Sequence, residues 1–183
     1  MIQTNDDDDE IQWIHAAQSG DESAFRSLFD RYYEVVYRVL YRLAGNQQDA
    51  EDLVQEAFVK AARRLPGFRG EASFKNWLCR IAVNAARDWF RKCQRRPATA
   101  DAREDQPSSL EQLAAPRRNA THDLLHDSLG QLKEKERQAL VLTYFEGFNH
   151  AEAAEVLRCA ESTVSWHIHQ AKQKLKEILS HHV

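Results

Sequence analysis

Apolar residues between positions 11 and 96 recur at intervals of three and four rather than two, which is typical of amphipathic helices and not of strands. The longest run places these residues on one helical face: Phe25, Leu28, Phe29, Tyr32, Tyr33, Val36, Val39, Leu40 and Leu43. A second stripe consists of Phe74, Trp77, Leu78, Ile81, Ala85 and Trp89. The N-terminal half is therefore predicted to be a small helical bundle.

Residues that end or cap helices divide this half into four predicted helices. The boundaries fall at Gly20, Asp21, Gly45, Asn46, Pro66 and Gly67. Asp49 and Ser73 are the candidate N-caps of the third and fourth helices, because their side-chain oxygens can accept backbone N–H groups.

The C-terminal half shows the same helical period in shorter segments. Helices are predicted over 123–132, 134–145, 150–157 and 162–179, with Gly147 ending the second. The last two are joined by a tight turn at 158–161, which gives them the proportions of a helix-turn-helix. We therefore predict an all-α fold with two small helical domains.

A polar segment separates the two halves. Pro97, Pro107 and Pro116 lie among Ala, Arg, Asp, Ser and Gln, a composition that buries too little apolar surface to fold alone. The chain is accordingly divided into an acidic, disordered N-terminus (1–9), a first domain (10–96), a flexible linker (97–120) and a second domain (121–183).

Basic residues are concentrated in one segment of the chain. The whole chain has a formal net charge of −3, yet residues 63–96 contain ten Arg and Lys against two Asp and Glu. Large aromatics lie within the same stretch: Phe68, Phe74, Trp77 and Trp89. Cations pair with phosphates and aromatic rings stack on unpaired bases, so this surface is predicted to bind a nucleic-acid strand.

Other compositional features exclude several classes of protein. Cys79, Cys93 and Cys159 have no paired spacing, which argues against a disulfide framework and a cysteine zinc site. No apolar run approaches the roughly 18 residues that span a bilayer, and residues 6–10 are acidic where a signal peptide would be basic. We expect a soluble cytoplasmic protein without a cofactor and with no membrane insertion of its own.

The last helix has two distinct faces. Val164, Ile168, Ala171 and Leu175 form its apolar stripe. Trp166, Gln170 and Gln173, flanked by His169, form the opposite face, where Gln and an aromatic ring can contact base edges. Candidate phosphate contacts are Ser162, Thr163, Lys172, Lys174 and Lys176. The alternative is an amphipathic helix that packs on a partner.

Two further clusters allow more than one interpretation. Asp49, Glu51, Asp52 and Glu56 either complement the helix dipole or form a surface for a basic partner. His122 and His126 are spaced i, i+4, which on a helix can hold zinc, and His167 and His169 form a separate H-x-H pair. No third ligand is evident from the spacing, so no metal is expected.

Two sets of motifs resemble a known family. Residues 49–58 (DAEDLVQEAF), 68–71 (FRGE) and 74–84 resemble region 2 of bacterial RNA polymerase sigma factors of the extracytoplasmic-function (ECF) type. Residues 152–157 (EAAEVL), 162–166 (STVSW) and 171–172 resemble their region 4. The two sets lie in the family's order around a polar linker and cover most of the chain.

The resemblance implies a sigma factor that binds core RNA polymerase and promoter DNA and directs promoter recognition and melting. The implied polymerase contacts are Asp49, Asp52, Gln55, Glu56 and Phe58. The implied contacts to the minus-ten element are Phe68, Arg69, Ser73, Lys75, Asn76, Trp77, Arg80, Asn84, Arg87 and Arg91. Those to the minus-thirty-five element are Ser162, Thr163, Ser165, Trp166, His167, His169, Gln170, Lys172 and Lys174. The family also leads us to expect an anti-sigma factor as a regulator.

Two positions depart from the family pattern: Arg158, where a small residue is common, and His167, where Arg is common. Two other functions remain open on the residues alone. One is a stand-alone helix-turn-helix regulator whose N-terminal domain mediates interactions. The other is a metal-dependent hydrolase that uses His122, Asp123 and His126.

Overall fold

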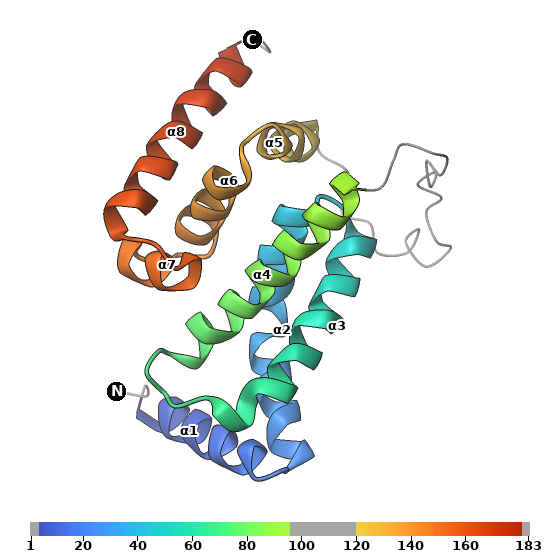
Figure 1. Cartoon of the computed structure of the whole chain (residues 1–183), viewed down its shortest axis with the longest axis vertical. Coiled ribbons are helices and arrows are strands. Elements are labelled where there is room, and N and C mark those ends of the chain that lie inside the picture. Colours follow the sequence, from blue (N-terminus) through green and yellow to red (C-terminus); the bar gives the residue numbers. More distant parts are fainter. Residues whose placement is uncertain (1–3, 96–119, 181–183) are drawn as a thin grey trace.

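The computed structural model describes residues 4–95 and 120–180, and within these ranges the chain contains helices and no strands. The first four helices form the N-terminal unit: α1 (Thr4–Gln18), α2 (Glu22–Ala44), α3 (Gln47–Arg64) and α4 (Phe74–Arg95). The C-terminal unit consists of α5 (Ala120–Gly130), α6 (Glu134–Leu140), α7 (His150–Leu157) and α8 (Glu161–Ser180) (Figure 1). The all-α prediction is confirmed, while the predicted linker lies outside the described residues except for residue 120.

The helix ends largely follow the capping residues. The Asp21 carboxylate accepts the backbone N–H groups of Ser23 and Ala24 at 2.8 and 3.2 Å, as a helix N-cap does. Ser73 likewise caps α4, accepting the backbone N–H of Asn76 at 3.2 Å. The acidic run at 6–10 differs from the expectation, because it lies in α1.

The predicted cap of α3 was one turn too late. Asn46, not Asp49, is the N-cap, and its side-chain oxygen accepts the Asp49 backbone N–H at 2.8 Å. The Asn46 amide also donates to the Asp49 carboxylate at 2.6 Å. Asp49 therefore lies in the first turn, beside the positive end of the helix dipole.

The helix predicted over 134–145 is interrupted. α6 ends at Leu140, and Val141–Phe145 form a π-helical turn that Gly147, with φ of 69°, brings to an end. α7 matches its predicted bounds, and α8 begins one residue early and ends one residue late. The turn between them places Arg158 in the left-handed region at φ of 53°.

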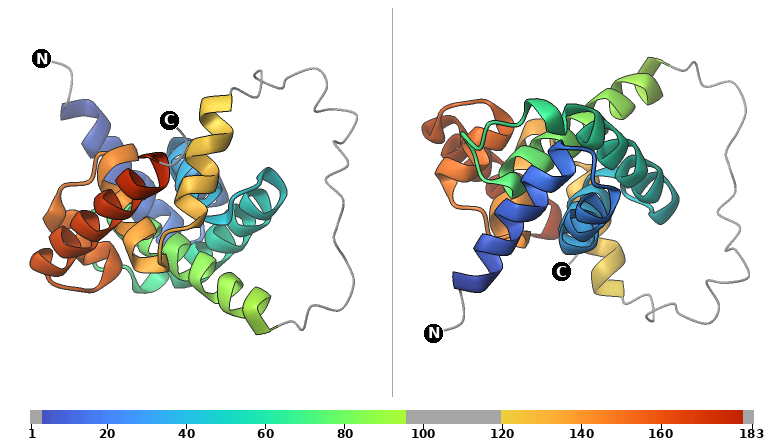
Figure 2. Two further views of the ribbon diagram at one scale, coloured as in Figure 1. Left: turned by 90° about the horizontal axis from the view of Figure 1, so that it is seen from above. Right: turned by 90° about the horizontal axis from the view of Figure 1, so that it is seen from below.

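The two units pack against each other. One continuous cluster of buried side chains includes Leu40 and Leu78 of the N-terminal unit and Leu142, Phe148 and Val156 of the C-terminal unit. α4 packs on α7, and α2 contacts the π turn and α5. The helices of the C-terminal unit lie on one side of α4, and α3 lies on the other (Figures 1 and 2). In the described part of the chain, no helix is long and apolar enough to cross a membrane.

Candidate nucleic-acid interface

An aromatic cluster forms where the loop after α3 meets α4. The Phe68 ring lies 5.0 Å from Trp77 and 5.6 Å from Phe74, measured between centroids. Gln18 of α1 holds this loop by donating to the backbone carbonyls of Leu65 and Phe68 at 3.1 and 2.7 Å. Sequence reasoning missed Gln18, because nothing in its spacing links it to a loop 47 to 50 residues away.

An open pocket of about 400 Å³ adjoins this cluster. Its lining residues are Gly67, Phe68, Arg69, Glu71, Ala72, Trp77, Arg80 and Glu155. It therefore combines aromatic surface with two guanidinium groups, a combination that suits a base and its phosphate. Phe68, Arg69, Trp77 and Arg80 are predicted strand contacts that the structure brings together here, although Trp77 is 8% exposed and only a small part of its side chain lines the opening.

A second, larger groove of about 610 Å³ continues along α4. Cations dominate its lining: Lys60, Arg64, Arg80, Arg87, Arg91 and Arg158, beside Asp88. Asn84 also lines it, as predicted. Lys60, Arg64 and Arg158 were not among the predicted contacts, since the first two lie on α3 and the third lies in the C-terminal unit.

Three of the predicted strand contacts bind residues of the C-terminal unit. Asn76 is only 6% exposed and donates from Nδ2 to Glu155 Oε2 at 2.7 Å. Arg87 Nε donates to Glu134 Oε1 at 3.1 Å. The Lys75 ammonium lies 4.1 Å from the centroid of the Phe148 ring. In each case the partner belongs to the C-terminal unit.

The predicted polymerase-binding face of α3 is only partly exposed. Asp52 and Gln55 are exposed, and Glu56 pairs with Lys60 at 2.5 Å. Phe58 differs from the prediction: it is 5% exposed and its ring lies 4.5 Å from that of Phe29. Phe58 is therefore a core residue of the N-terminal unit, because its position on α3 faces α2.

The outer face of α8 carries most of the predicted duplex contacts. Trp166 is 54% exposed, and Ser162, Ser165, His169 and Lys172 are exposed too. Thr163 and Gln170 are half-buried at the edges of this face.

Two predicted duplex contacts on α8 point elsewhere. His167 is 9% exposed, its Nδ1 has no hydrogen-bond partner, and burial followed by Lys135 lowers its pKa, while Glu136 opposes the shift. The Lys174 ammonium donates to the backbone carbonyl of Gln131 at 2.5 Å. His167 departs from the prediction because the ridge it occupies faces α6.

Among the described side chains, no group of three His, Cys, Asp or Glu could hold a metal ion. The side chains of His122, Asp123 and His126 lie outside the described part of the chain.

Comparison with known proteins identifies the two units. Residues 28–96 match the Sigma-70 region 2 family, and residues 122–175 match Sigma-70, region 4. RNA polymerase sigma-H factor from Pseudomonas aeruginosa is 33% identical over 178 residues, covering 92% of each chain. The chain belongs to the sigma-70 family. ECF RNA polymerase sigma-E factor from Escherichia coli K12 is also 33% identical, over 88% of this sigma factor and 90% of its relative.

Solved structures agree with this assignment. CnrH, solved in complex with the cytosolic domain of CnrY, aligns with a TM-score of 0.71 at 28% identity over 94% of this chain and 97% of CnrH. RpoE from Bartonella quintana shares the fold, with a TM-score of 0.66 at 23% identity over 85% and 96%. The protein is thus an ECF sigma factor that binds core RNA polymerase and directs transcription initiation at promoters. This decides against the stand-alone regulator and the hydrolase.

Proposed function

We propose a division of labour among three surfaces of this sigma factor. The exposed acidic face of α3, with Asp52 and Gln55, contacts core polymerase. The 400 Å³ pocket beside Trp77 takes a base extruded from the minus-ten element, and the cationic groove along α4 holds the strand that follows it. The outer face of α8 reads the minus-thirty-five element in the major groove.

The observation that carries this proposal is the pocket itself. Aromatic rings from Phe68 and Trp77 meet the guanidinium groups of Arg69 and Arg80 around one opening. A base that stacks on such rings contributes about 1–3 kcal/mol, which offsets part of the cost of opening the duplex. The protein would then drive melting by capture, with no catalytic group of its own.

The test measures strand opening by the holoenzyme at a promoter selected with wild-type protein. Trp77→Leu removes the ring but keeps apolar volume, and Trp77→Phe is the matched control that retains a ring. We expect Trp77→Leu to lower permanganate reactivity of the melted strand about tenfold while closed-complex affinity is kept. Equal reactivity of the two variants would contradict the proposed capture.

Two regulatory and cellular expectations belong to the same proposal. Because core polymerase and promoter DNA are its partners, we place the protein in the cytoplasm. Control by a separate anti-sigma factor remains a prediction; RpoE of Bartonella quintana was solved in complex with the anti-sigma factor NepR. Affinity purification of the full chain from its source tests both, since core polymerase and an inhibitor would each be recovered with it.

A further inference from the structure

The loop that carries Phe68 has little backbone support of its own. It follows the short turn Leu65–Gly67 and leads into α4. The Phe68 backbone N–H donates to the Leu65 carbonyl at 2.9 Å, but among the described residues no backbone–backbone hydrogen bond involves residues 69–72. Gly70, with φ of 71°, adds further freedom, since glycine loses more conformational entropy on ordering than any other residue. Such a loop keeps one conformation only where another element holds it.

Gln18 of α1 supplies this support. It is the last residue of the helix and is half-buried. Its Nε2 donates to the backbone carbonyl of Leu65 at 3.1 Å and to that of Phe68 at 2.7 Å. A side-chain amide nitrogen has two N–H groups, so both donors of Gln18 are used on the loop. The orientation of the Phe68 backbone is therefore fixed from α1.

The same stretch of chain forms one wall of the 400 Å³ pocket. Gly67, Phe68 and Arg69 are consecutive residues of its lining, whereas Gln18 does not line it. Phe68 contributes both the carbonyl that Gln18 holds and the ring that lies 5.0 Å from the Trp77 ring. Because rotation of that carbonyl would move the backbone carrying the ring, Gln18 acts on the shape of the pocket without touching its occupant.

α1 is also anchored at a second point along its length. Glu10 accepts from the Tyr32 hydroxyl of α2 and pairs with Arg31 Nε at 3.3 Å. The Tyr32 ring in turn lies 5.4 Å from the ring of Phe74, a member of the aromatic cluster. Between these two points Ile14 is 8% exposed and belongs to the core. α1 therefore joins α2 to the loop.

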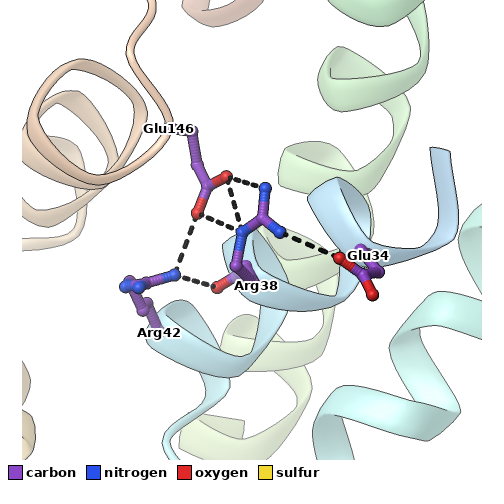
Figure 3. Close-up of polar contacts among 4 residues, drawn as sticks. All are labelled: Glu34, Arg38, Arg42 and Glu146. Atoms are coloured by element: carbon purple, nitrogen blue, oxygen red, sulfur yellow. Dashed lines mark hydrogen bonds and ion pairs between the residues drawn. The ribbon is translucent and has the colours of Figure 1, made fainter.

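α2 is itself well restrained, so it gives α1 a fixed support. It packs on α3 and on α4, the helix that carries Trp77. Farther along α2, Arg38 and Arg42 pair with the buried carboxylate of Glu146 at 3.1 and 2.9 Å, as Figure 3 shows. The position of Gln18 relative to Trp77 is thus set by packed helices and not by the loop.

We propose that Gln18 is a positioning residue for base capture, which holds the Phe68 loop in the conformation that accepts an extruded base. Without its two hydrogen bonds the loop samples other conformations, and a pocket that is formed for only a fraction of the time binds its base more weakly in proportion to that fraction. The inference rests on the proposed role of the pocket. It adds the residue of a different helix that keeps this pocket formed.

Three variants separate hydrogen bonding from packing. Gln18→Leu removes both donors at similar volume. Gln18→Lys keeps N–H donors that can serve the two carbonyls, so it should restore the function that Leu loses. The matched control is Gln12→Leu, which makes the same change at an exposed position of α1.

The first measurement is promoter opening by holoenzyme, followed by permanganate reactivity of the melted strand. We expect Gln18→Leu to lower reactivity about tenfold at a promoter selected with wild-type protein, with closed-complex affinity within about twofold of wild type. Gln18→Lys and Gln12→Leu should stay close to wild type. Equal losses for Gln18→Leu and Gln18→Lys, or for Gln18→Leu and Gln12→Leu, would overturn the proposal.

An abasic promoter tests whether the loss concerns base capture. The abasic site is placed at the minus-ten position where its introduction most weakens opening by wild-type holoenzyme. With no base to capture there, wild type and Gln18→Leu should open this promoter equally within about twofold. A tenfold difference that persists on the abasic promoter would mean that Gln18 acts elsewhere, and would overturn the proposal.

Hydrogen exchange reports the loop without DNA. In the free full-length protein, the Phe68 amide should exchange about tenfold faster in Gln18→Leu than in Gln12→Leu, while the buried amide of Leu53 on α3 exchanges equally in both. Equal exchange at Phe68 would overturn the proposal. Faster exchange at both amides would do so too, because it would indicate general loss of structure.

Failure of this inference is distinguishable from failure of the pocket. The comparison of Trp77→Leu with Trp77→Phe tests base capture itself. If those two variants differ as expected and Gln18→Leu opens promoters like wild type, only the positioning role of Gln18 is disproved.

Discussion

At the scale of single residues, Arg158 carries the clearest backbone strain. It is the one non-glycine with positive φ among the described residues, and it ends α7 in the left-handed conformation that favours glycine. We expect Arg158→Gly to raise the free energy of unfolding by about 0.5–1 kcal/mol, because the Cβ clash is removed. Urea denaturation measures this.

Arg158→Ala is the matched control, since it loses the same charge but keeps a Cβ. It should show no gain in the free energy of unfolding. Equal stabilisation by Ala and Gly would assign the effect to the lost guanidinium, which lines the cationic groove, and not to the backbone.

His167 predicts a pH effect on stability. Burial and Lys135 lower its pKa from the usual 6.5, so the folded protein binds fewer protons than the unfolded chain as pH falls below that value. Stability is therefore complete above about pH 6.5 and is lost as pH falls toward the lowered folded pKa. Thermal midpoints at about pH 7.5 and 5.5 should differ more for wild type than for His167→Gln.

The exposed neighbour His169 supplies the control for this profile. His169→Gln should keep the wild-type difference between the two midpoints, because the side chain lies on the outer face of α8. If His167→Gln also kept the full difference, other groups would have to account for the pH dependence.

At the scale of the elements, α7 depends on a reciprocal cap. Asn149 accepts the backbone N–H of Glu152 at 2.9 Å, and the Glu152 carboxylate accepts the backbone N–H of Asn149 at 2.8 Å. Asn149→Ala should lower the free energy of unfolding by about 1 kcal/mol, whereas Asn149→Ser should stay close to wild type. Urea titrations of the three proteins measure this free energy. Equal losses of stability for Asn149→Ala and Asn149→Ser would contradict a capping role.

α8 makes a prediction about sequence preference. Trp166 is exposed and contributes little to the core. Trp166→Ala should therefore leave the thermal midpoint nearly unchanged but alter the base preference of the protein in the minus-thirty-five element. Gln170→Ala should relax preference at one base position, since a bidentate contact discriminates by about 1–3 kcal/mol. Selection from a randomised upstream library measures both, and unchanged selected sequences would remove the readout role of this face.

The elements themselves could be predicted from the sequence, because the helical period and the capping residues are local signals. Asp21, Ser73 and the bounds of α7 followed from such signals. The π turn at Val141–Phe145 did not, since its residues have ordinary helical composition and packing against α2 accompanies the change of register. Amphipathic spacing likewise placed Trp166 outward correctly but could not reveal that Phe58 and His167 face neighbouring helices.

At the scale of the whole molecule, only part of the candidate site could be predicted from the sequence. The basic run and its aromatics located the strand-binding surface, because they lie within one stretch of chain. Residues that engage it come from the other unit: Glu155 accepts from Asn76 across 79 positions, and Glu134 accepts from Arg87 across 47. Such pairings follow from the tertiary arrangement and leave no periodic signal.

The shared core predicts how the molecule unfolds. Phe148 is 3% exposed, belongs to the same buried cluster as Leu40 and Leu78, and has the Lys75 ammonium over its ring. Two units joined by such a core should unfold together, so calorimetry should give one transition whose calorimetric and van't Hoff enthalpies agree. Phe148→Ala, which removes about 3–5 kcal/mol of packing, should separate this transition into two.

Tyr144→Ala is the control for that experiment, because Tyr144 lies on the π turn just before Phe148 but is 57% exposed. It should preserve the single transition. Two transitions in the wild-type protein would mean that contact between the units contributes too little to couple them. In that case the N-terminal unit would melt at the same temperature in wild type and in Phe148→Ala. Coupling of the two units through the core would then be contradicted.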